Sequence, residues 1–247
     1  MNVLILGGSK GIGRATALQF SSEGNQLFVN YAHDDEVAFV TASEIMERGA
    51  VAHLIKADVG DPAAIKEMLS QIKSKTDRLD LIVHCAVAII PGDGLSLSWD
   101  EWQRAISVSN LSLVETIREA MPLLQHGSSI IALSSRGSDH VGPRYAAMGS
   151  TKAFTEAIVR YLVLELAPKG IRINVVSPGT LETDALRRLF SEEESVEEYL
   201  EYEKSLNPSG RGLQFEDVTQ VIAFLASPAA QMIQGRVIPI DGGRGLL

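Results

Sequence analysis

The sequence predicts an α/β protein built on one parallel, doubly wound sheet with helices on both faces. Two observations support this prediction. Short runs of apolar and β-branched residues alternate with longer amphipathic stretches along the whole chain. The apolar runs contain few polar residues, as strands do when helices cover both sides of their sheet. No linker or internal repeat interrupts the alternation, so we expect residues 1–247 to form a single domain.

The predicted elements follow one another in a regular order. The first half of the chain has strands at 2–6, 26–32, 51–59 and 79–87 and helices at 13–24, 35–49 and 63–76. After a longer connection come a strand at 128–135, a helix at 151–170, a strand at 171–179, a helix at 218–227 and a strand within 235–243. Glycine and proline residues stand at the ends of these elements, as in "APKG" at the end of the helix at 151–170.

The composition is typical of a globular protein and excludes several classes of function. Hydrophobic residues make up 45% of the chain, and the net charge of -9 argues against a nucleic-acid partner, which requires a basic surface. No apolar stretch is long enough to cross a bilayer, and the N-terminus lacks the pattern of a signal peptide, so we expect a cytoplasmic protein without membrane contacts. Cys85 is the one cysteine and the histidines are scattered, so neither a disulfide nor a metal site is expected.

A glycine-rich loop stands between the first strand and the first helix. Gly7, Gly11 and Gly13 have the spacing G-x-x-x-G-x-G in "LGGSKGIG". Glycines here allow a tight turn and a close approach to a pyrophosphate, and the helix N-terminus offers free N–H groups. The loop therefore predicts a dinucleotide site. Its expected contacts are Gly7, Ser9, Lys10, Gly11, Ile12 and Gly13.

A second motif, "YAAMGSTK", covers residues 145–152. Tyr145 and Lys152 are seven positions apart, and a helix turns by about 100° per residue, so both side chains are expected on one helical face. A lysine that faces inward among apolar neighbours needs a partner. We therefore expect Tyr145 and Lys152 to share one site.

Several motifs together resemble the short-chain dehydrogenase/reductase family over essentially the whole chain. They are the glycine spacing, "ADV" at 57–59, "SPG" at 177–179 and "DGG" at 241–243. The resemblance implies a nicotinamide-dependent oxidoreductase with a Rossmann-type sheet of about seven strands. It places Asp58 at the adenine edge and Thr183 at the carboxamide or the phosphates of the cofactor. The further cofactor contacts that it implies are Val59, Cys85, Lys152, Pro178 and Gly179.

The position of the tyrosine distinguishes this chain within that family. Most members place the catalytic tyrosine four residues before the lysine, where this chain has Met148. The spacing Tyr-x6-Lys resembles that of the enoyl-acyl carrier protein reductases, and the C-terminal half looks most like their NADPH-dependent type III class. The resemblance implies reduction of the carbon–carbon double bond of an enoyl thioester, in fatty-acid or polyketide synthesis.

The chemistry of enoyl reduction gives a reason for the displaced tyrosine. When a hydride adds to the β-carbon, negative charge develops on the thioester oxygen, which lies further from the nicotinamide than a ketone oxygen does. A phenol displaced by one helical turn, roughly 5 Å, could reach that oxygen. Tyr145 is therefore expected to act as the general acid. The alternative is an aromatic residue beside a loop.

Three further residues are expected to assist Tyr145. Lys152 would hold the ribose hydroxyls of the cofactor, and its ammonium would favour the phenolate form of the tyrosine. Ser135, at the end of a strand, would support the substrate oxygen or the tyrosine, or would only cap the strand end. Asn110 lies in the helical pattern 105–120, where asparagine is a poor helix former. The resemblance implies that it holds a water, and the alternative is a polar helix face.

Residues near the end of the second strand bear on the choice of cofactor. An acidic residue at that position would bind the 2′-hydroxyl of NAD, and this chain has Tyr31 there. Lys10 in the phosphate loop also favours NADP. His33 occupies a region where related NADPH enzymes often have a basic residue, and a surface turn is its alternative interpretation. Asp34 and Asp35 are close enough to leave NAD open.

Two departures from the family pattern affect the cofactor site. Leu6 replaces the usual threonine before the first glycine, so a hydroxyl that ties down the loop is missing. "HCAV" at 84–87 replaces the usual Asn-Asn-Ala-Gly in the cofactor-facing wall after the fourth strand. Neither change removes a catalytic group, and both could alter cofactor affinity.

Residues 181–212 are the expected substrate lid. The lid contains the acidic run "SEEESVEEYLEYEK", which is typical of a solvated helix face and should repel an acidic acyl carrier protein unless it points away. The choice between an acyl carrier protein and a CoA thioester therefore stays open. The basic candidates for either partner are Arg187, Arg188, Lys204 and Arg211.

Two other functions are compatible with these residues. One is a ketoreductase that acts on a β-ketoacyl or another carbonyl compound, with Met148 as the observation against it. The other is a catalytically silent NADPH-binding or regulatory protein. In either case the resemblance suggests a homodimer or homotetramer, and residues 156–167, apolar on more than one face, are a candidate interface helix.

Overall fold

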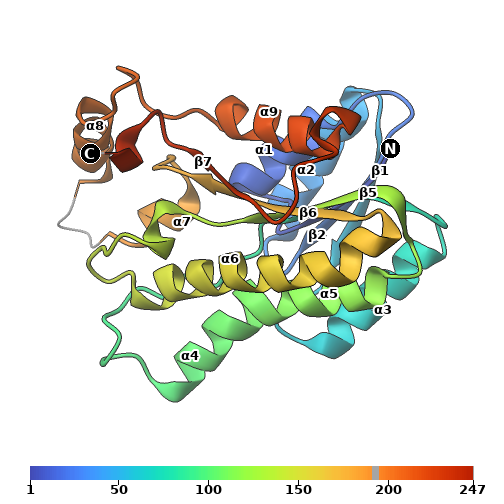
Figure 1. Ribbon diagram of the computed structural model, residues 1–247, viewed down its shortest axis with the longest axis horizontal. Coiled ribbons are helices and arrows are strands. Elements are labelled where there is room, and N and C mark those ends of the chain that lie inside the picture. Colours follow the sequence, from blue (N-terminus) through green and yellow to red (C-terminus); the bar gives the residue numbers. More distant parts are fainter. Residues whose placement is uncertain (191–194, 247) are drawn as a thin grey trace.

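Seven parallel strands form the sheet of the computed structural model, which describes residues 1–190 and 195–246 (Figure 1). The strands are β1 (Asn2–Leu6), β2 (Gln26–Tyr31), β3 (Val51–Lys56), β4 (Leu79–His84), β5 (Leu124–Leu133), β6 (Arg172–Pro178) and β7 (Val237–Ile240). Their spatial order is β3-β2-β1-β4-β5-β6-β7, and each neighbouring pair is parallel. The prediction of a doubly wound parallel sheet is confirmed.

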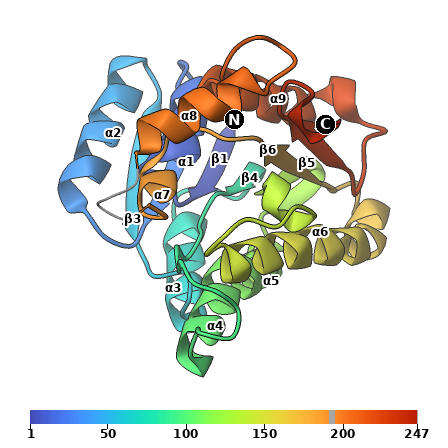
Figure 2. The same ribbon diagram turned by 90° about the vertical axis from the view of Figure 1, so that its left-hand side faces the viewer.

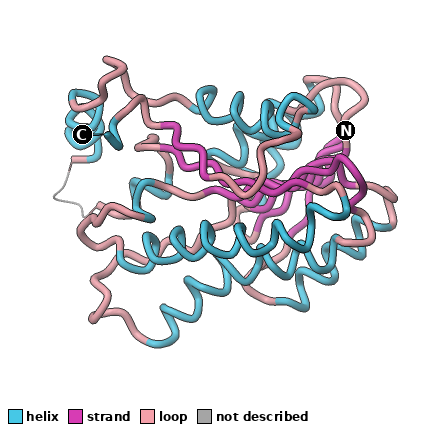
Figure 3. Tube along the Cα trace, in the orientation of Figure 1, coloured by secondary structure: helices cyan, strands magenta, loops and turns pink. Residues whose placement is uncertain are grey.

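Helices form a layer on each face of this sheet, as Figure 3 shows by colour. On one face lie α3 (Pro62–Lys73), α4 (Trp99–Ile106), α5 (Ser112–Ala120) and α6 (Ala146–Leu166). On the other face lie α1 (Gly11–Gln19), α2 (Asp35–Glu47) and α9 (Phe215–Ala226). Two short helices, α7 (Asp184–Arg187) and α8 (Val196–Ser205), lie at one edge of the sheet (Figure 2).

The first strand shows why its sequence is apolar throughout. Val3 and Ile5 belong to the core beneath α1, α2 and α9, whereas Leu4 and Leu6 belong to the core beneath α3, α5 and α6. All four side chains are fully buried. Successive side chains of a strand point to opposite faces, so a sheet covered on both sides requires an apolar residue at every position.

The strand order also determines where a ligand can bind. β1 pairs with β2 on one side and with β4 on the other. After β1 the chain extends the sheet in one direction through β2 and β3, and then in the opposite direction from β4 to β7. In open α/β sheets of this kind a crevice forms at the carboxyl ends of the strands, beside the switch point. The glycine loop follows β1 directly, and α7 and α8 lie at the same edge (Figures 1 and 2).

The start of α6 differs from the prediction. The helix begins at Ala146, earlier than expected, and Tyr145 is its N-cap residue, with φ -110° and ψ 11°. The prediction that Tyr145 stands on a helical face is therefore wrong in detail. The chain is held differently here because Arg144 has a φ of 55° and Tyr145 forms an isolated bridge with Gly92. The backbone N–H of Gly92 donates to the carbonyl of Arg144 at 2.9 Å, which fixes the orientation of the next residue.

The segment between β4 and β5 is helical, as the pattern at 105–120 predicts. A capping box of Ser98 and Glu101 begins α4. A π-helical turn, Ser107–Leu111, then joins α4 to α5. Such turns are uncommon and occur often at functional sites, and this one contains Asn110.

Across the described ranges 1–190 and 195–246, no helix combines the length and the apolar character needed to cross a membrane. The same residues contain no group of three or more His, Cys, Asp or Glu side chains that could hold a metal ion.

Candidate active site

A cleft of about 1380 Å³ opens at the carboxyl ends of the strands. Its walls come from the glycine loop, the ends of β2 to β6, the first turns of α6, and the segments 178–190 and 199–213. Of the predicted site residues, those that line the cleft are Gly7, Ser9, Lys10, Gly11, Ile12, Gly13, Tyr31, His33, Asp58, Val59, Cys85, Ser135, Tyr145, Lys152, Pro178, Gly179 and Thr183. The sequence therefore identified residues that lie far apart in the chain and meet in one cleft.

The glycine loop has the geometry of a phosphate cradle. Gly7 has a φ of 69°, and a Cβ atom at this position would lie 3.0 Å from the backbone of Ala86. At Gly13 a Cβ atom would lie 2.1 Å from the carbonyl oxygen of Gly7. The N-cap residue of α1, Lys10, makes no side-chain cap hydrogen bond, so the first N–H groups of the helix stay available for an anion. The loop fits the pyrophosphate of a dinucleotide.

Asn30 ties down this loop, a role that the sequence did not reveal. Its Oδ1 accepts a hydrogen bond from the backbone N–H of Gly7 at 3.3 Å, and its Nδ2 donates to the carbonyls of Ile55 and Ala57. The side chain is almost fully buried under the loop. Asn30 thus supplies the anchor that Leu6, whose side chain lies in the core, cannot supply.

Carboxylates pair with the cations at the adenosine end of the cleft. The Nζ of Lys10 lies 2.5 Å from Asp34, and the Nζ of Lys56 lies 2.8 Å from Asp35. The hydrogen bond from Lys10 lowers the pKa of Asp34 below its usual value, so this carboxylate is ionised at neutral pH. Tyr31 donates its hydroxyl to Asp35 at 2.8 Å. The predicted contribution of Lys10 to a 2′-phosphate is therefore opposed by Asp34.

Asp58 also has a partner within the chain. One of its carboxylate oxygens accepts from the backbone N–H of Gly60 at 2.9 Å, and the other lies 2.9 Å from a guanidinium nitrogen of Arg104. Arg104 belongs to α4, so this ion pair links the end of β3 to the helical layer. The pair keeps the Asp58 carboxylate at the cleft, as its predicted position at the adenine edge requires.

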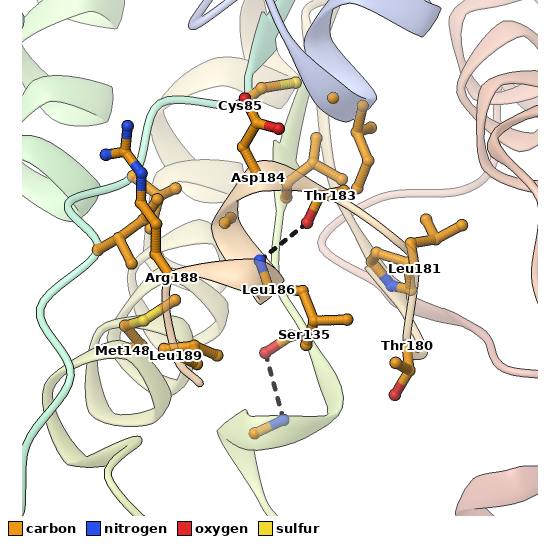
Figure 4. A pocket seen from close by; sticks show the side chains of 18 of the residues that line it. Cys85, Ser135, Met148, Thr180, Leu181, Thr183, Asp184, Leu186, Arg188 and Leu189 are labelled. Carbon is orange, nitrogen blue, oxygen red and sulfur yellow. Dashed lines mark hydrogen bonds between the residues drawn. The ribbon is translucent and has the colours of Figure 1, made fainter. Parts of the chain in front are cut away.

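Tyr145 and Ser135 form the hydroxyl pair of the cleft. Their oxygens are 3.3 Å apart, and either can be the donor. Ser135 is oriented by the backbone N–H of Gly137, which donates to its Oγ at 3.2 Å (Figure 4). A Cβ atom at Gly137 would lie 2.4 Å from the ring of Tyr145, so glycine is needed for the ring to pack here. Burial raises the pKa of Tyr145, and the hydrogen bond to Ser135 lowers it in part. The phenol is therefore protonated at neutral pH and can donate a proton.

Met148 occupies the position four residues before Lys152. Its side chain is 4% exposed and lies in the cleft wall near Leu189 and Arg188 (Figure 4). A thioether cannot donate a proton. At this turn of α6 the cleft therefore has an apolar wall, and the hydroxyl of Tyr145 stands about one turn earlier in the chain.

Lys152 is buried and donates from Nζ to the carbonyl of Leu133 at 2.9 Å. Burial lowers the pKa of Lys152 to about 8, although Cys85 and Glu156 act in the opposite direction. The expected influence of this ammonium on the tyrosine stays a prediction. The pKa of Tyr145 responds to burial, Ser135 and Tyr199, and it is raised. The Lys152 amine instead lies against β5, beside the place where the cofactor ribose is expected.

This pKa predicts a pH dependence of cofactor binding. The Lys152 ammonium is present below about pH 7 and is lost as the pH rises through about 8. If ribose hydroxyls bind the ammonium, the Kd for NADPH should rise by up to about tenfold per pH unit above 8. Fluorescence titration of NADPH between pH 6.5 and 9.5 measures this effect. A Lys152→Met variant should bind more weakly with a flat profile, whereas an identical slope in the variant would contradict the assignment.

His84 and Cys85 replace two residues of the usual family wall. Burial lowers the pKa of His84 to about 3, so the ring is neutral, and its Nε2 lies 2.7 Å from the Oγ of Ser112 on α5. Burial raises the pKa of Cys85 to about 12, so its thiol is not a nucleophile at neutral pH. His84 thus links the sheet to α5, and Cys85 provides a small surface beside the glycine loop.

Asn110, which the resemblance implies holds a water, does not itself line the cleft. Its side chain is fully buried, and Nδ2 donates to the carbonyl of Thr151 and the hydroxyl of Thr155 on α6. The π-helical turn directs it toward α6 instead of the cleft. Its Oδ1 is buried and has no partner among the described residues, which leaves one acceptor for a bound water. Asn110 is a positioning residue for the helix that carries Lys152.

The predicted lid lies over the cleft, apart from 191–194, which fall outside the described residues. Thr183 caps α7, accepting from the backbone N–H of Leu186 at 3.1 Å (Figure 4). Its side chain would lie 3.6 Å from a Cβ atom at Gly11, so Thr183 faces the phosphate loop rather than the nicotinamide end. Three of the four basic candidates pair with carboxylates, and Arg188, for which the described residues offer no such partner, lines the cleft. Arg187 pairs with Glu182 and Glu197, Lys204 with Glu201, and Arg211 with Asp217.

The sequence of this chain is similar to those of known reductases. A family model described as Enoyl-(Acyl carrier protein) reductase matches residues 7–244. Versicolorin reductase stcU of Emericella nidulans is 33% identical over 97% of this chain and 94% of its own length. The 1-cyclohexenylcarbonyl-CoA reductase of Streptomyces collinus is 31% identical, over 99% and 86%. The 3-oxoacyl-[acyl-carrier-protein] reductase FabG of Staphylococcus aureus is 32% identical, over 98% and 97%.

The fold is similar to solved structures of the same kind. A short-chain dehydrogenase/reductase from Serratia marcescens superposes with a TM-score of 0.89 at 28% identity and covers 99% of this chain and 97% of its own. The NADP active-site complex of RhlG from Pseudomonas aeruginosa has a TM-score of 0.87 at 27% identity, over 99% and 96%.

Proposed function

We propose that this chain, an oxidoreductase that belongs to the short-chain dehydrogenase/reductase family, uses NADPH to reduce the carbon–carbon double bond of an enoyl thioester. The main support is the position of the acid. The Tyr145 hydroxyl lies 3.3 Å from Ser135, whereas the position four residues before Lys152 holds the buried side chain of Met148.

The residues of the cleft have distinct roles in this reaction. When bound, the cofactor supplies a hydride for the β-carbon of the substrate and is itself oxidised. Tyr145 donates its proton to the thioester oxygen as charge develops there, and Ser135 orients the phenol. The resulting enol takes up a proton from solvent at the α-carbon while its oxygen proton returns to Tyr145, so that two electrons and two hydrogens are added in total and the phenol is restored. Lys152 holds the cofactor ribose, and Met148 keeps water from the reacting double bond.

The preference for NADPH is part of the proposal. Lys10 and His33 line the adenosine end of the cleft, and the RhlG structure is described as an NADP complex. Asp34 acts against this preference because its carboxylate lies 2.5 Å from Lys10 and would repel a 2′-phosphate.

Replacing Asp34 by asparagine should therefore strengthen the preference for NADPH. Asparagine keeps the N-cap of α2 and tolerates the φ of 69°, but it removes the charge. We expect the ratio of kcat/KM for NADPH over NADH to rise by about tenfold, the effect of one unfavourable charge near a phosphate. Asp61→Asn, at the exposed N-cap of α3 outside the cleft, is the matched control. An unchanged ratio would show that the 2′-position does not face Asp34.

Ketone reduction is the second candidate. Tyr145 and Ser135 are close enough to bind one carbonyl oxygen together, and FabG of Staphylococcus aureus carries the name of a 3-oxoacyl reductase. In that case the substrate carbonyl would bind at Tyr145. Its oxygen would then lie about one helical turn further from Lys152 than if the acid stood at the position of Met148.

Oxidation of NADPH with crotonyl-CoA and, separately, with acetoacetyl-CoA distinguishes these functions. Turnover of the enoyl substrate supports our proposal, and a preference for acetoacetyl-CoA would replace it by ketone reduction. Binding of NADPH without turnover of either substrate would indicate a silent, regulatory protein.

Self-association is proposed from the surface of α6. Tyr161 and Leu164 are 71% and 77% exposed, and both lie in the candidate interface helix 156–167. Exposed apolar side chains at this spacing are typical of a helix that packs against a second copy. Sedimentation of the protein with and without a Leu164→Glu substitution tests for a homodimer or homotetramer.

A further inference from the structure

We propose that the acyl group of the substrate carries a second acidic function, a carboxylate, which Arg136 and Arg244 bind in the cleft. This inference rests on the proposed function, because it places the carboxylate on the thioester that Tyr145 protonates. The two arginines are far apart in the sequence, one directly after β5 and the other after β7, and these two strands flank β6 in the sheet. Both line the cleft.

A single glutamate joins the two arginines. Glu203 of α8 lies 3.4 Å from a guanidinium nitrogen of Arg244 and 4.0 Å from one of Arg136. Thr180 donates its hydroxyl to the same carboxylate at 3.4 Å. These distances are long for charge-assisted hydrogen bonds, which usually measure about 2.7–2.9 Å. Glu203 therefore bridges the arginines without satisfying either of them closely.

The charges and donors of this cluster are out of balance. Two guanidinium groups face one carboxylate, and the side chains of Arg136, Arg244 and Glu203 are only 26%, 17% and 16% exposed. The Nε–H groups of both arginines are buried, and neither finds an acceptor within residues 1–190 and 195–246. An unpaired buried donor on a charged group is costly. Among the residues that the structure describes, the cluster thus has one positive charge and two donors in excess, which a second carboxylate would satisfy.

The cluster lies close to the reacting atoms. Arg136 directly follows Ser135 in the chain, and Ser135 is hydrogen bonded to Tyr145. The hydroxyl of Tyr199, which lies on α8 with Glu203, is near enough to raise the pKa of Tyr145. We therefore place the anion on the acyl chain itself, in the part of the cleft where Tyr199 is near both Tyr145 and the two arginines. The phosphate of a CoA or carrier arm is separated from the thioester by the whole pantetheine chain, so it does not fit this position.

Matched pairs of substrates test the inference. Glutaconyl-CoA and trans-2-pentenoyl-CoA differ only by a carboxylate in place of a terminal methyl. A desolvated ion pair with arginine should give glutaconyl-CoA a kcat/KM higher by about tenfold or more. For ketone reduction the corresponding pair is 3-oxoadipyl-CoA and 3-oxohexanoyl-CoA. Two different failures can be told apart with these pairs. If the proposed function is wrong, neither member of the enoyl pair is turned over. If only this inference is wrong, both members are turned over with the same kcat/KM.

Variants of the cluster should move that difference in opposite directions. Arg244→Met should lower the ratio of kcat/KM within a pair, whereas Glu203→Gln should raise it, because the internal carboxylate no longer competes. Arg118→Met, at an exposed arginine on α5 paired with Glu115, is the control and should leave the ratio unchanged. Calorimetric Kd values for glutaryl-CoA and pentanoyl-CoA report on the site without turnover. Equal affinities and equal kcat/KM values within every pair would overturn the inference, even if Arg244→Met does not fold.

Discussion

Replacement of Tyr145 by phenylalanine is expected to lower kcat for the enoyl substrate by about two to four orders of magnitude, the usual contribution of a positioned general acid. The change removes one oxygen atom and keeps the ring that packs on Gly137. Burial keeps the pKa of Tyr145 above its usual value, so the lost group is a neutral phenol that can donate a proton. The nearest alternative donor, Ser135, has a much higher pKa than a phenol and cannot replace it. Steady-state assays of NADPH oxidation with crotonyl-CoA measure this decrease in kcat.

Tyr202→Phe is the matched control for this variant. Tyr202 lies on α8 and not in the cleft lining, and it is 59% exposed, so activity should be unchanged. The Kd for NADPH should also stay constant in Tyr145→Phe, since the phenol is bonded to Ser135 and, in the proposed reaction, serves the substrate and not the cofactor ribose. If Tyr145→Phe kept most of its activity with the enoyl substrate, another residue would be the acid and the displaced-tyrosine interpretation would be wrong.

The fold could be predicted largely because its rules are local. Helices cover both faces of the sheet, so each strand is apolar throughout. A run such as 2–6 can therefore be recognised as a strand without knowing which strands pair with it. Element ends were less accurate. The start of α6 depends on the bridge between Gly92 and Tyr145, a contact between segments far apart in the chain, and no local pattern contains it.

The candidate site could likewise be predicted where it depends on short motifs, but not where it depends on contacts between distant segments. The glycine loop and the Tyr-x6-Lys spacing are short motifs, and every predicted residue of these motifs lines the cleft. Asn30 escaped notice because it reads as a polar residue within a strand. Only the fold places it under Gly7. The available signal was an asparagine near the end of the second strand, together with Leu6 where the family usually has a threonine.

Charge pairing could not be obtained from the sequence. Lys10 favoured NADP as long as it was considered alone, and its pairing with Asp34 depends on how the turn after β2 folds back. The same holds for Arg136, Glu203 and Arg244, which come from three separate elements. A net charge of -9 for the whole chain gave no indication of a local excess of positive charge in the cleft.

Substitution of Gly13 by alanine should have the largest effect on cofactor binding among changes outside the catalytic group. The new Cβ atom would lie 2.1 Å from the carbonyl oxygen of Gly7, a distance at which the backbone must move. Gly7 cannot move away to relieve this clash, because the backbone of Ala86 packs closely on its other side. The phosphate loop should therefore separate from α1, with a stability loss of about 1–3 kcal/mol, as for other overpacked sites. The Kd for NADPH should rise by at least about tenfold, since the N–H groups of α1 no longer converge on the pyrophosphate.

Gly94→Ala separates this effect from a general response to a new methyl group. A Cβ atom at Gly94 would meet its nearest neighbour at 3.7 Å, an ordinary contact, and Gly94 lies outside the cleft lining. Thermal unfolding and NADPH fluorescence titration of both variants measure the two effects. Because the clash at Gly13 lies within the loop itself, stability and cofactor affinity should fall together in Gly13→Ala and should both be kept in Gly94→Ala. A Gly13→Ala protein that binds NADPH normally would show that the loop can widen, and the pyrophosphate would then have to be held by residues other than the first turn of α1.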